Sequence, residues 1–202
     1  MKILGSNLHT SFGDCWKIVS LACNLSERGE TSIAVGNASQ RVQTLFKEIS
    51  AVLDGGDKIS IFDRCDCHVN INQFIPTVKT KFRWQKGTSH RRICYQFDGA
   101  YRSELKNPPV AHIDLFKAKL GSVEAICLGK HLSVSECVRH ASTSDCFVGV
   151  DSGMAQLCYS VGVPVYLLRY KQEQATIDAW HGDKPTRICL DIEEFLEIWN
   201  SW

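Results

Sequence analysis

The segment at residues 147–166 constrains the fold of this chain more than any other. It consists of the apolar run FVGV, the turn DSG at 151–153, a helix-forming stretch of small residues, and GVP at 162–164 before a second apolar run. Such apolar runs predict buried strands of a parallel sheet, and the first one brings the turn to the carboxyl edge of that sheet. The chain is therefore predicted to be an α/β protein with a turn of functional interest at a sheet edge.

The same turn is suited to binding an anion. Ser152 and Gly153 would open the helix, and the first N–H groups of a helix have no partner within it. These groups and the helix dipole favour a negative charge, and ligands of open α/β sheets bind at the carboxyl edge. The alternative is that the turn at 151–153 is only a helix cap in an unrelated α/β protein.

Length and charge exclude several function classes. With 202 residues and 44% hydrophobic content the chain can build one ordinary α/β domain or two small ones. A formal charge of +1 provides no overall attraction to nucleic acid or to an anionic membrane. No stretch approaches ~18 uninterrupted apolar residues, and the chain enters a short strand at its start, so we predict a cytoplasmic protein without a membrane span.

The cysteines do not form an evident metal or disulfide framework. The chain has 10 cysteines, scattered through apolar segments where a reduced thiol behaves as a small core residue. Residues 65–68, with the sequence CDCH, crowd their donor side chains together, and no second Cys-x-x-Cys completes a four-ligand zinc set. We also find no Asp-x-Asp pair suited to holding a divalent ion on a diphosphate. The expectation is that no metal and no other cofactor is needed.

The first part of the chain alternates between strand and helix patterns. Apolar runs predict strands at 2–8, 31–36 and 58–63, and amphipathic spacing predicts helices at 13–28 and 38–53. This alternation favours a parallel sheet with right-handed crossovers. A first Rossmann-like lobe is therefore expected.

The periodicity is lost at residues 64–90, where basic residues alternate with aromatic ones such as Trp84. We place the boundary between two lobes here, with a first domain at 1–90 and a second at 91–202. The boundary segment is either a solvated connector or a basic, aromatic surface for an acidic or planar acceptor.

The second part repeats the alternation. The expected elements are strands at 92–97, 124–128, 146–150 and 165–168, and helices at 112–120, 133–142, from 153 onward and at 192–199. The last helix is amphipathic and either closes the second lobe or packs back on the first. The fold class is thus α/β, with two small Rossmann-like lobes of parallel strands and a reduced first lobe.

Two motifs together resemble a known family. The turn at 151–153 with its small-residue helix and Gly-x-Pro is similar to the donor-site segment of the heptosyltransferase-like glycosyltransferases, and the sequence SFGD at 11–14 is similar to their acceptor-side loop. The resemblance covers residues 1–36 and most of 92–168. It implies the two-lobed GT-B architecture and metal-independent, inverting transfer of a sugar from a nucleoside-diphosphate sugar to a hydroxyl acceptor.

The resemblance also implies roles for single residues. Asp14 would be the general base, with Ser11 and Gly13 beside it on the acceptor side; its alternative role is that of a charge complementing the helix dipole. The donor diphosphate would lie against the N–H groups of residues 152–154 (Ser152, Gly153 and Met154), next to Asp151, with Arg102 or Lys106 as cations. Arg102 is alternatively an exposed loop charge.

The remaining expectations concern the base, the acceptor and one departure from the family. Gly129 and Lys130 would meet the nucleobase, and Trp84 and His181 would lie on the acceptor side. Gln156 stands where the family usually has a histidine, and glutamine carries no positive charge.

The acceptor would be a glycan of the lipopolysaccharide type or a hydroxylated base in DNA. The alternative functions are epimerisation or hydrolysis of a nucleotide sugar, or non-catalytic binding of one.

Overall fold

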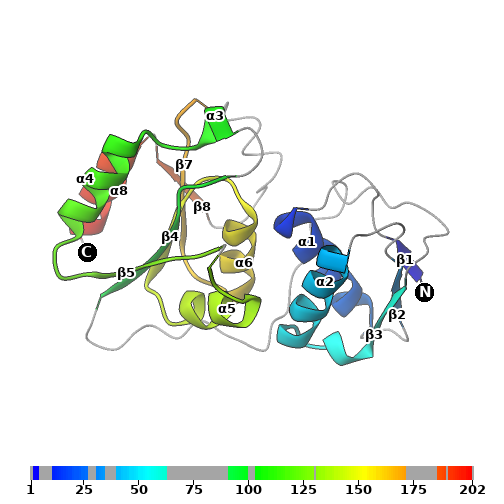
Figure 1. Ribbon diagram of the computed structural model, residues 1–202. Helices are drawn as coiled ribbons and strands as arrows, with labels where there is room; N and C mark the ends of the chain where they lie inside the picture. Colours follow the sequence, from blue (N-terminus) through cyan, green and yellow to red (C-terminus); the bar gives the residue numbers. More distant parts are fainter. Residues whose placement is uncertain are drawn as a thin grey trace.

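The structure is a computed structural model, and it describes residues 2–4, 11–26, 31–34, 40–62, 91–99, 103–129, 131–171, 186–189 and 191–201. These residues form two parallel sheets, each with its own helices (Figure 1). We call the described part of 2–62 the first lobe and that of 91–201 the second lobe. The predicted α/β class, with two lobes of parallel strands, is confirmed.

The first lobe has a three-stranded sheet in the order β1-β2-β3. Its strands are β1 (Lys2–Leu4), β2 (Thr31–Ala34) and β3 (Ile59–Phe62). The helices α1 (Phe12–Ser26) and α2 (Gln40–Val52) connect them, and a short 3-10 turn, η1 (Gly56–Lys58), precedes β3. Both helices lie on the side of this sheet that faces the second lobe (Figure 1).

The second lobe has a five-stranded sheet in the order β5-β4-β6-β7-β8, and all its pairs are parallel. The strands are β4 (Arg92–Gln96), β5 (Glu124–Cys127), β6 (Cys146–Gly149), β7 (Val165–Leu168) and β8 (Thr186–Cys189). The chain moves from β4 to one side to make β5 and then to the other side to make β6. The crevice at the carboxyl ends of β4 and β6 is therefore the topological switch point, where ligands of such sheets bind.

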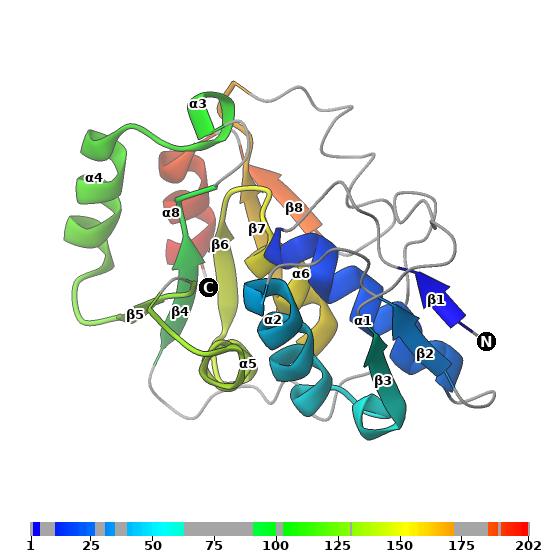
Figure 2. The same cartoon turned by 45° about the vertical axis from the view of Figure 1, so that its right-hand side comes forward.

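Helices cover both faces of this sheet (Figures 1 and 2). They are α3 (Ser103–Lys106), α4 (Val110–Leu120), α5 (Val134–Ser142), α6 (Gly153–Val161) and α8 (Ile192–Asn200). Buried strand residues alternate between the faces as the pleat requires: Phe147 packs with α5 and α6, whereas Val148 packs with α4 and α8. The continuous apolar strands noted in the sequence result from this two-sided burial.

Several elements differ from the sequence expectations. The final helix, for which two placements were open, lies against α4 and β8 in the second lobe. The strand β8, with the sequence TRIC, and the short helix α3, with the sequence SELK, were not predicted, because neither contains the apolar run or the helical spacing that identified the other elements. None of the helices within the described ranges has the length and apolar character needed to cross a bilayer.

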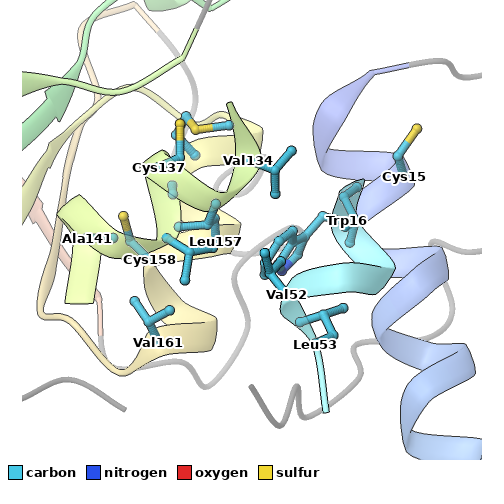
Figure 3. Packing of buried hydrophobic residues seen from close by; sticks show 14 of the residues in the cluster. Cys15, Trp16, Val52, Leu53, Val134, Cys137, Ala141, Leu157, Cys158 and Val161 are labelled. Atoms are coloured by element: carbon cyan, nitrogen blue, oxygen red, sulfur yellow. The ribbon is translucent and has the colours of Figure 1, made fainter. Parts of the chain in front are cut away.

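The two lobes share one apolar core. The helices α1 and α2 pack against α5 and α6, and Figure 3 shows Trp16, Val52 and Leu53 of the first lobe opposite Val134 and Leu157 of the second. The indole Nε1 of Trp16 donates a hydrogen bond to the Oγ of Ser160, on α6, at 2.8 Å. This packing holds the amino-terminal ends of α1 and α6 in a defined position relative to each other.

Candidate functional site

The amino-terminal end of α1 is closed by a reciprocal pair of hydrogen bonds. The N–H of Asp14 donates to the Oγ of Ser11 at 3.2 Å, and the hydroxyl of Ser11 donates to Oδ2 of Asp14 at 2.7 Å. Asp14 is half-buried in the first turn of the helix, where a negative charge complements the dipole. The pair fixes the carboxylate of Asp14 at the end of α1 that faces the second lobe.

The amino-terminal end of α6 is not capped by the side chain of Ser152. Ser152 has the extended backbone of an N-cap residue, with φ −148° and ψ 170°, but its side chain makes no cap hydrogen bond. Its Oγ is buried and has no hydrogen-bond partner among the described residues. The simple alternative, in which the serine of this turn serves as a side-chain cap, does not describe the arrangement.

These two helix ends touch each other through glycines. A Cβ placed on Gly153 would lie 2.6 Å from the backbone N of Gly13 and 2.7 Å from Cδ1 of Phe12. A Cβ on Gly13 would lie 3.1 Å from Cα of Gly153. A residue larger than glycine at position 13 or 153 would therefore force the two backbones apart. The motifs at 11–14 and 151–153 are thus neighbours in space (Figure 2).

Lys106 brings a cation to the same place. Its Nζ lies 2.9 Å from Oδ2 of Asp151 and 3.1 Å from the backbone carbonyl oxygen of Asp151. Both side chains are only 11% exposed. The preceding loop is held by the N–H of Gly99, which donates to Oδ1 of Asn107 at 2.7 Å. Lys106 therefore lies at the carboxyl ends of β4 and β6, at the switch point.

Lys17 also belongs to this site, and the sequence reasoning missed it. It lies on α1, three residues after Asp14, and is half-buried. Burial lowers its pKa, while the negative charges of Asp14 and of Asp151 act in the opposite direction. Residues three apart lie on the same side of a helix, so the spacing between Asp14 and Lys17 could have marked Lys17 as a candidate site residue.

The other residues predicted to bind the donor lie deeper in the second lobe or further along the carboxyl edge of its sheet. Met154 and Gln156 are buried on α6, and Met154 is part of the shared core. Gly129 follows β5 with φ +124°, and a Cβ on it would lie 3.0 Å from Nε2 of Gln96. The Oε1 of Gln96, at the end of β4, is buried without a hydrogen-bond partner in the described part of the chain.

Four predicted residues lie outside the described residues: Arg102, Lys130, Trp84 and His181. The structure does bring together Ser11, Gly13 and Asp14 of the first lobe with Lys106 and residues 151–153 of the second. The two helix ends and two lysines form a setting suited to an anion, and a half-buried carboxylate beside them can accept a proton.

Comparisons with known proteins show the fold. No protein-family model matches the chain, and a search of curated proteins finds no significant match. Among solved structures, TibC from enterotoxigenic E. coli H10407, a bacterial iron-containing dodecameric glycosyltransferase, matches with a TM-score of 0.54 and 12% identity over 85% of this chain and 59% of that chain. TibC in complex with ADP-D-beta-D-heptose matches with a TM-score of 0.50 and 12% identity, over 85% of this chain and 60% of that chain.

These matches correct one expectation. The prediction that no metal is involved is wrong, because both TibC structures are of an iron-containing enzyme. The prediction rested on the resemblance and on a missing Asp-x-Asp pair, and that missing pair concerns only a divalent ion on the diphosphate. In the described ranges no three His, Cys, Asp or Glu side chains are grouped to hold a metal ion, so these residues do not fit an iron site. The CDCH sequence at 65–68 lies outside those ranges.

A third structure extends the likeness over the whole chain. E. coli heptosyltransferase WaaC with ADP matches with a TM-score of 0.50 and 10% identity, over 100% of this chain and 98% of that chain. The chain spans about three fifths of the TibC structures, with 59% and 60% of their length covered. At sequence identities this low the matches support a shared architecture only. The chain has the fold of the heptosyltransferase-like glycosyltransferases.

Proposed function

We propose that the protein is a glycosyltransferase that moves a sugar from a nucleoside-diphosphate sugar to a hydroxyl acceptor. One observation carries the proposal: the amino-terminal ends of α1 and α6 meet at the switch point of the second sheet, with Asp14 from one lobe and Lys106 from the other. An anion site and a candidate base thus come together from different lobes, and such an arrangement can hold two substrates side by side for transfer. The fold shared with TibC and WaaC supports the same reading.

The donor would bind to the second lobe. The N–H groups of Ser152, Gly153 and Met154 at the start of α6, with Lys106 beside them, would stabilise the negative charge that develops on the departing diphosphate. The nucleobase would lie along the edge formed by β4 and β5, near Gly129. ADP-sugars are the first donors to examine, because TibC was solved with ADP-D-beta-D-heptose and WaaC with ADP.

The acceptor would bind on the first-lobe side, residues 1–90. Asp14 would take the proton of the acceptor hydroxyl as that oxygen attacks the anomeric carbon. A single displacement of this kind inverts the configuration at the anomeric carbon. Acceptors to be screened are glycans and hydroxylated bases in DNA, the two classes that the sequence suggests.

A thermal-shift panel tests the donor site. UDP-, GDP-, ADP- and CMP-linked sugars and their free nucleotides are compared, because a ligand that binds only the folded state raises the melting temperature. We expect one nucleotide class to respond. The response should be lost in Ser152→Trp, which fills the space at the start of α6, and kept in Ser135→Trp, at an exposed position of α5.

The outcomes separate the candidate functions. A responding donor whose sugar appears on an acceptor supports transfer. Turnover of the donor without an acceptor would point to hydrolysis or epimerisation, and binding without any turnover would point to a non-catalytic module. No response to any nucleotide in the wild-type protein would contradict the proposal.

A further inference from the structure

Lys17 occupies an unusual place for a lysine, because it is half-buried where the two lobes meet. It lies on α1, one helical turn after Asp14, and α1 packs against α6 on both sides of this position: Gly13 touches Gly153, and Trp16 donates a hydrogen bond to Ser160. Lysine ammonium groups are strongly hydrated, and removing them from water is unfavourable unless a negative charge compensates. The position therefore calls for anionic neighbours.

The anionic neighbours of Lys17 come from both lobes. The carboxylate of Asp14, in the first lobe, and that of Asp151, in the second, both favour its charged form. Asp151 is also bound by Lys106 at 2.9 Å. The formal charges of these two aspartates and two lysines cancel, so the described site has no net charge before a substrate binds.

The diphosphate of a nucleotide sugar brings about two negative charges to this place at neutral pH, because each of its two bridged phosphates keeps one ionised oxygen. The helix α6 has no Lys, Arg or His in its sequence, and its Gln156 supplies no positive charge. The cations that face its amino-terminal end must therefore come from other elements. Lys106 on α3 forms an ion pair with Asp151, and Lys17 on α1 lies within range of the negative charge of Asp151, on the same face of α1 as Gly13, which touches Gly153.

We propose that Lys17 is a diphosphate-binding residue of the donor site, contributed by the first lobe to the amino-terminal end of α6. Its ammonium, which the charges of Asp14 and Asp151 favour in the free protein, turns to the diphosphate when the donor binds. This inference rests on the proposed function and assigns to α1 a part in holding the donor, in addition to the acceptor-side role of Asp14. It also makes donor binding dependent on the contact between the lobes.

Isothermal titration calorimetry on the full chain tests this role. The variants are Lys17→Met, which keeps the length of the side chain without its charge, Lys17→Arg, and Lys47→Met as a control at an exposed position of α2. The ligands are UDP, GDP, ADP and CDP, each with its monophosphate, and inorganic pyrophosphate as a probe without a base. Thermal unfolding of each variant checks that it is folded.

We expect Lys17→Met to weaken binding of the responding nucleoside diphosphate and of pyrophosphate about 10- to 100-fold, the usual effect of removing one charged hydrogen-bond donor. The monophosphate should lose much less, Lys17→Arg should recover part of the affinity, and Lys47→Met should bind like the wild type. A merely structural role of Lys17 would affect diphosphate and monophosphate alike.

Two results would overturn the inference, and they are distinguishable. Unchanged or uniformly weakened binding in a folded Lys17→Met variant would exclude Lys17 as a diphosphate ligand while leaving the proposed function in place. Absence of binding of all nucleoside diphosphates and of pyrophosphate to the wild-type protein would remove the proposed function and the inference together.

Discussion

At the scale of single residues, Asp14 has a structural role at the start of α1, and we propose that it also acts as the base; the sequence presented these two roles as alternatives. Its backbone N–H and its carboxylate form a reciprocal pair with Ser11, which is how a residue near a helix start stabilises that start. The same pair holds the carboxylate next to Gly13, which touches Gly153 of the second lobe, and this is where the proposed base would be needed. A substitution that keeps the shape of the side chain therefore separates the two roles.

Asp14→Asn should reduce sugar transfer strongly and leave the fold intact. The amide remains able to accept the hydrogen bond from Ser11, whereas it cannot act as a base, so we expect transfer to fall by about 10²- to 10⁴-fold. Sugar transfer and donor affinity are measured side by side, with Asp57→Asn on the exposed turn η1 as the control. A transfer rate equal to that of the wild type would show that Asp14 is not the base.

At the scale of elements, the helix α5 shows how local sequence fixes a boundary. The side chain of Ser133 accepts a hydrogen bond from the N–H of Glu136, and the carboxylate of Glu136 accepts one from the N–H of Ser133. These bonds define where α5 begins and so where Val134 and Cys137 enter the shared core. The helix supports the site by packing and has no part in its chemistry.

Ser133→Ala should lower the free energy of unfolding by about 1 kcal/mol, because the side-chain half of the reciprocal cap is lost. Donor affinity should not change, since α5 contributes no residue to the candidate site. Urea denaturation of Ser133→Ala is compared with that of Ser135→Ala, which lies at an exposed position of the same helix and should differ from the wild type by less than about 0.5 kcal/mol. Equal stability of the two variants would contradict the importance of the cap.

At the scale of the whole molecule, buried cysteines of the described residues lie in the cores of both lobes. Cys15 lies on α1 and Cys189 at the end of β8, and each is at most 1% exposed. Burial raises the pKa of each of these thiols to about 12, with neighbouring carboxylates contributing. In the unfolded chain the same thiols have their ordinary pKa of 9.0 and lose their protons near that pH.

This difference predicts a loss of stability at alkaline pH. A thiol whose pKa is higher in the folded state contributes its full stabilisation below about pH 9, and the contribution falls as the pH rises toward 12. Between about pH 8 and pH 10.5 the free energy of unfolding should fall by about 2 kcal/mol for each thiol. Urea denaturation across this range measures the slope, which should be smaller in Cys15→Ala and in Cys189→Ala. A slope unchanged in both variants would contradict the assignment.

Much of the fold could be read from local patterns. The alternation of apolar runs with amphipathic stretches identified the main strands of both sheets and the longer helices, because the pleat and the helical turn impose their periods on any segment with a buried face. The turn at 151–153 was placed at a sheet edge for the same reason. Helix ends were predicted within a few residues, as for α1, expected at 13–28 and described at 12–26.

The sequence by itself determined the order of strands and helices, the parallel sheets and the two glycine-containing turns, since these depend on neighbours along the chain. Only the tertiary structure decided that α1 packs alongside α6 with their amino-terminal ends together, that α8 stays in the second lobe, and that Lys17 comes near the charge of Asp151. Those facts depend on which apolar faces of distant segments bury each other, as Trp16 and Leu157 do. Such pairings are set by the packing of the whole core, and no local period in the sequence encodes them.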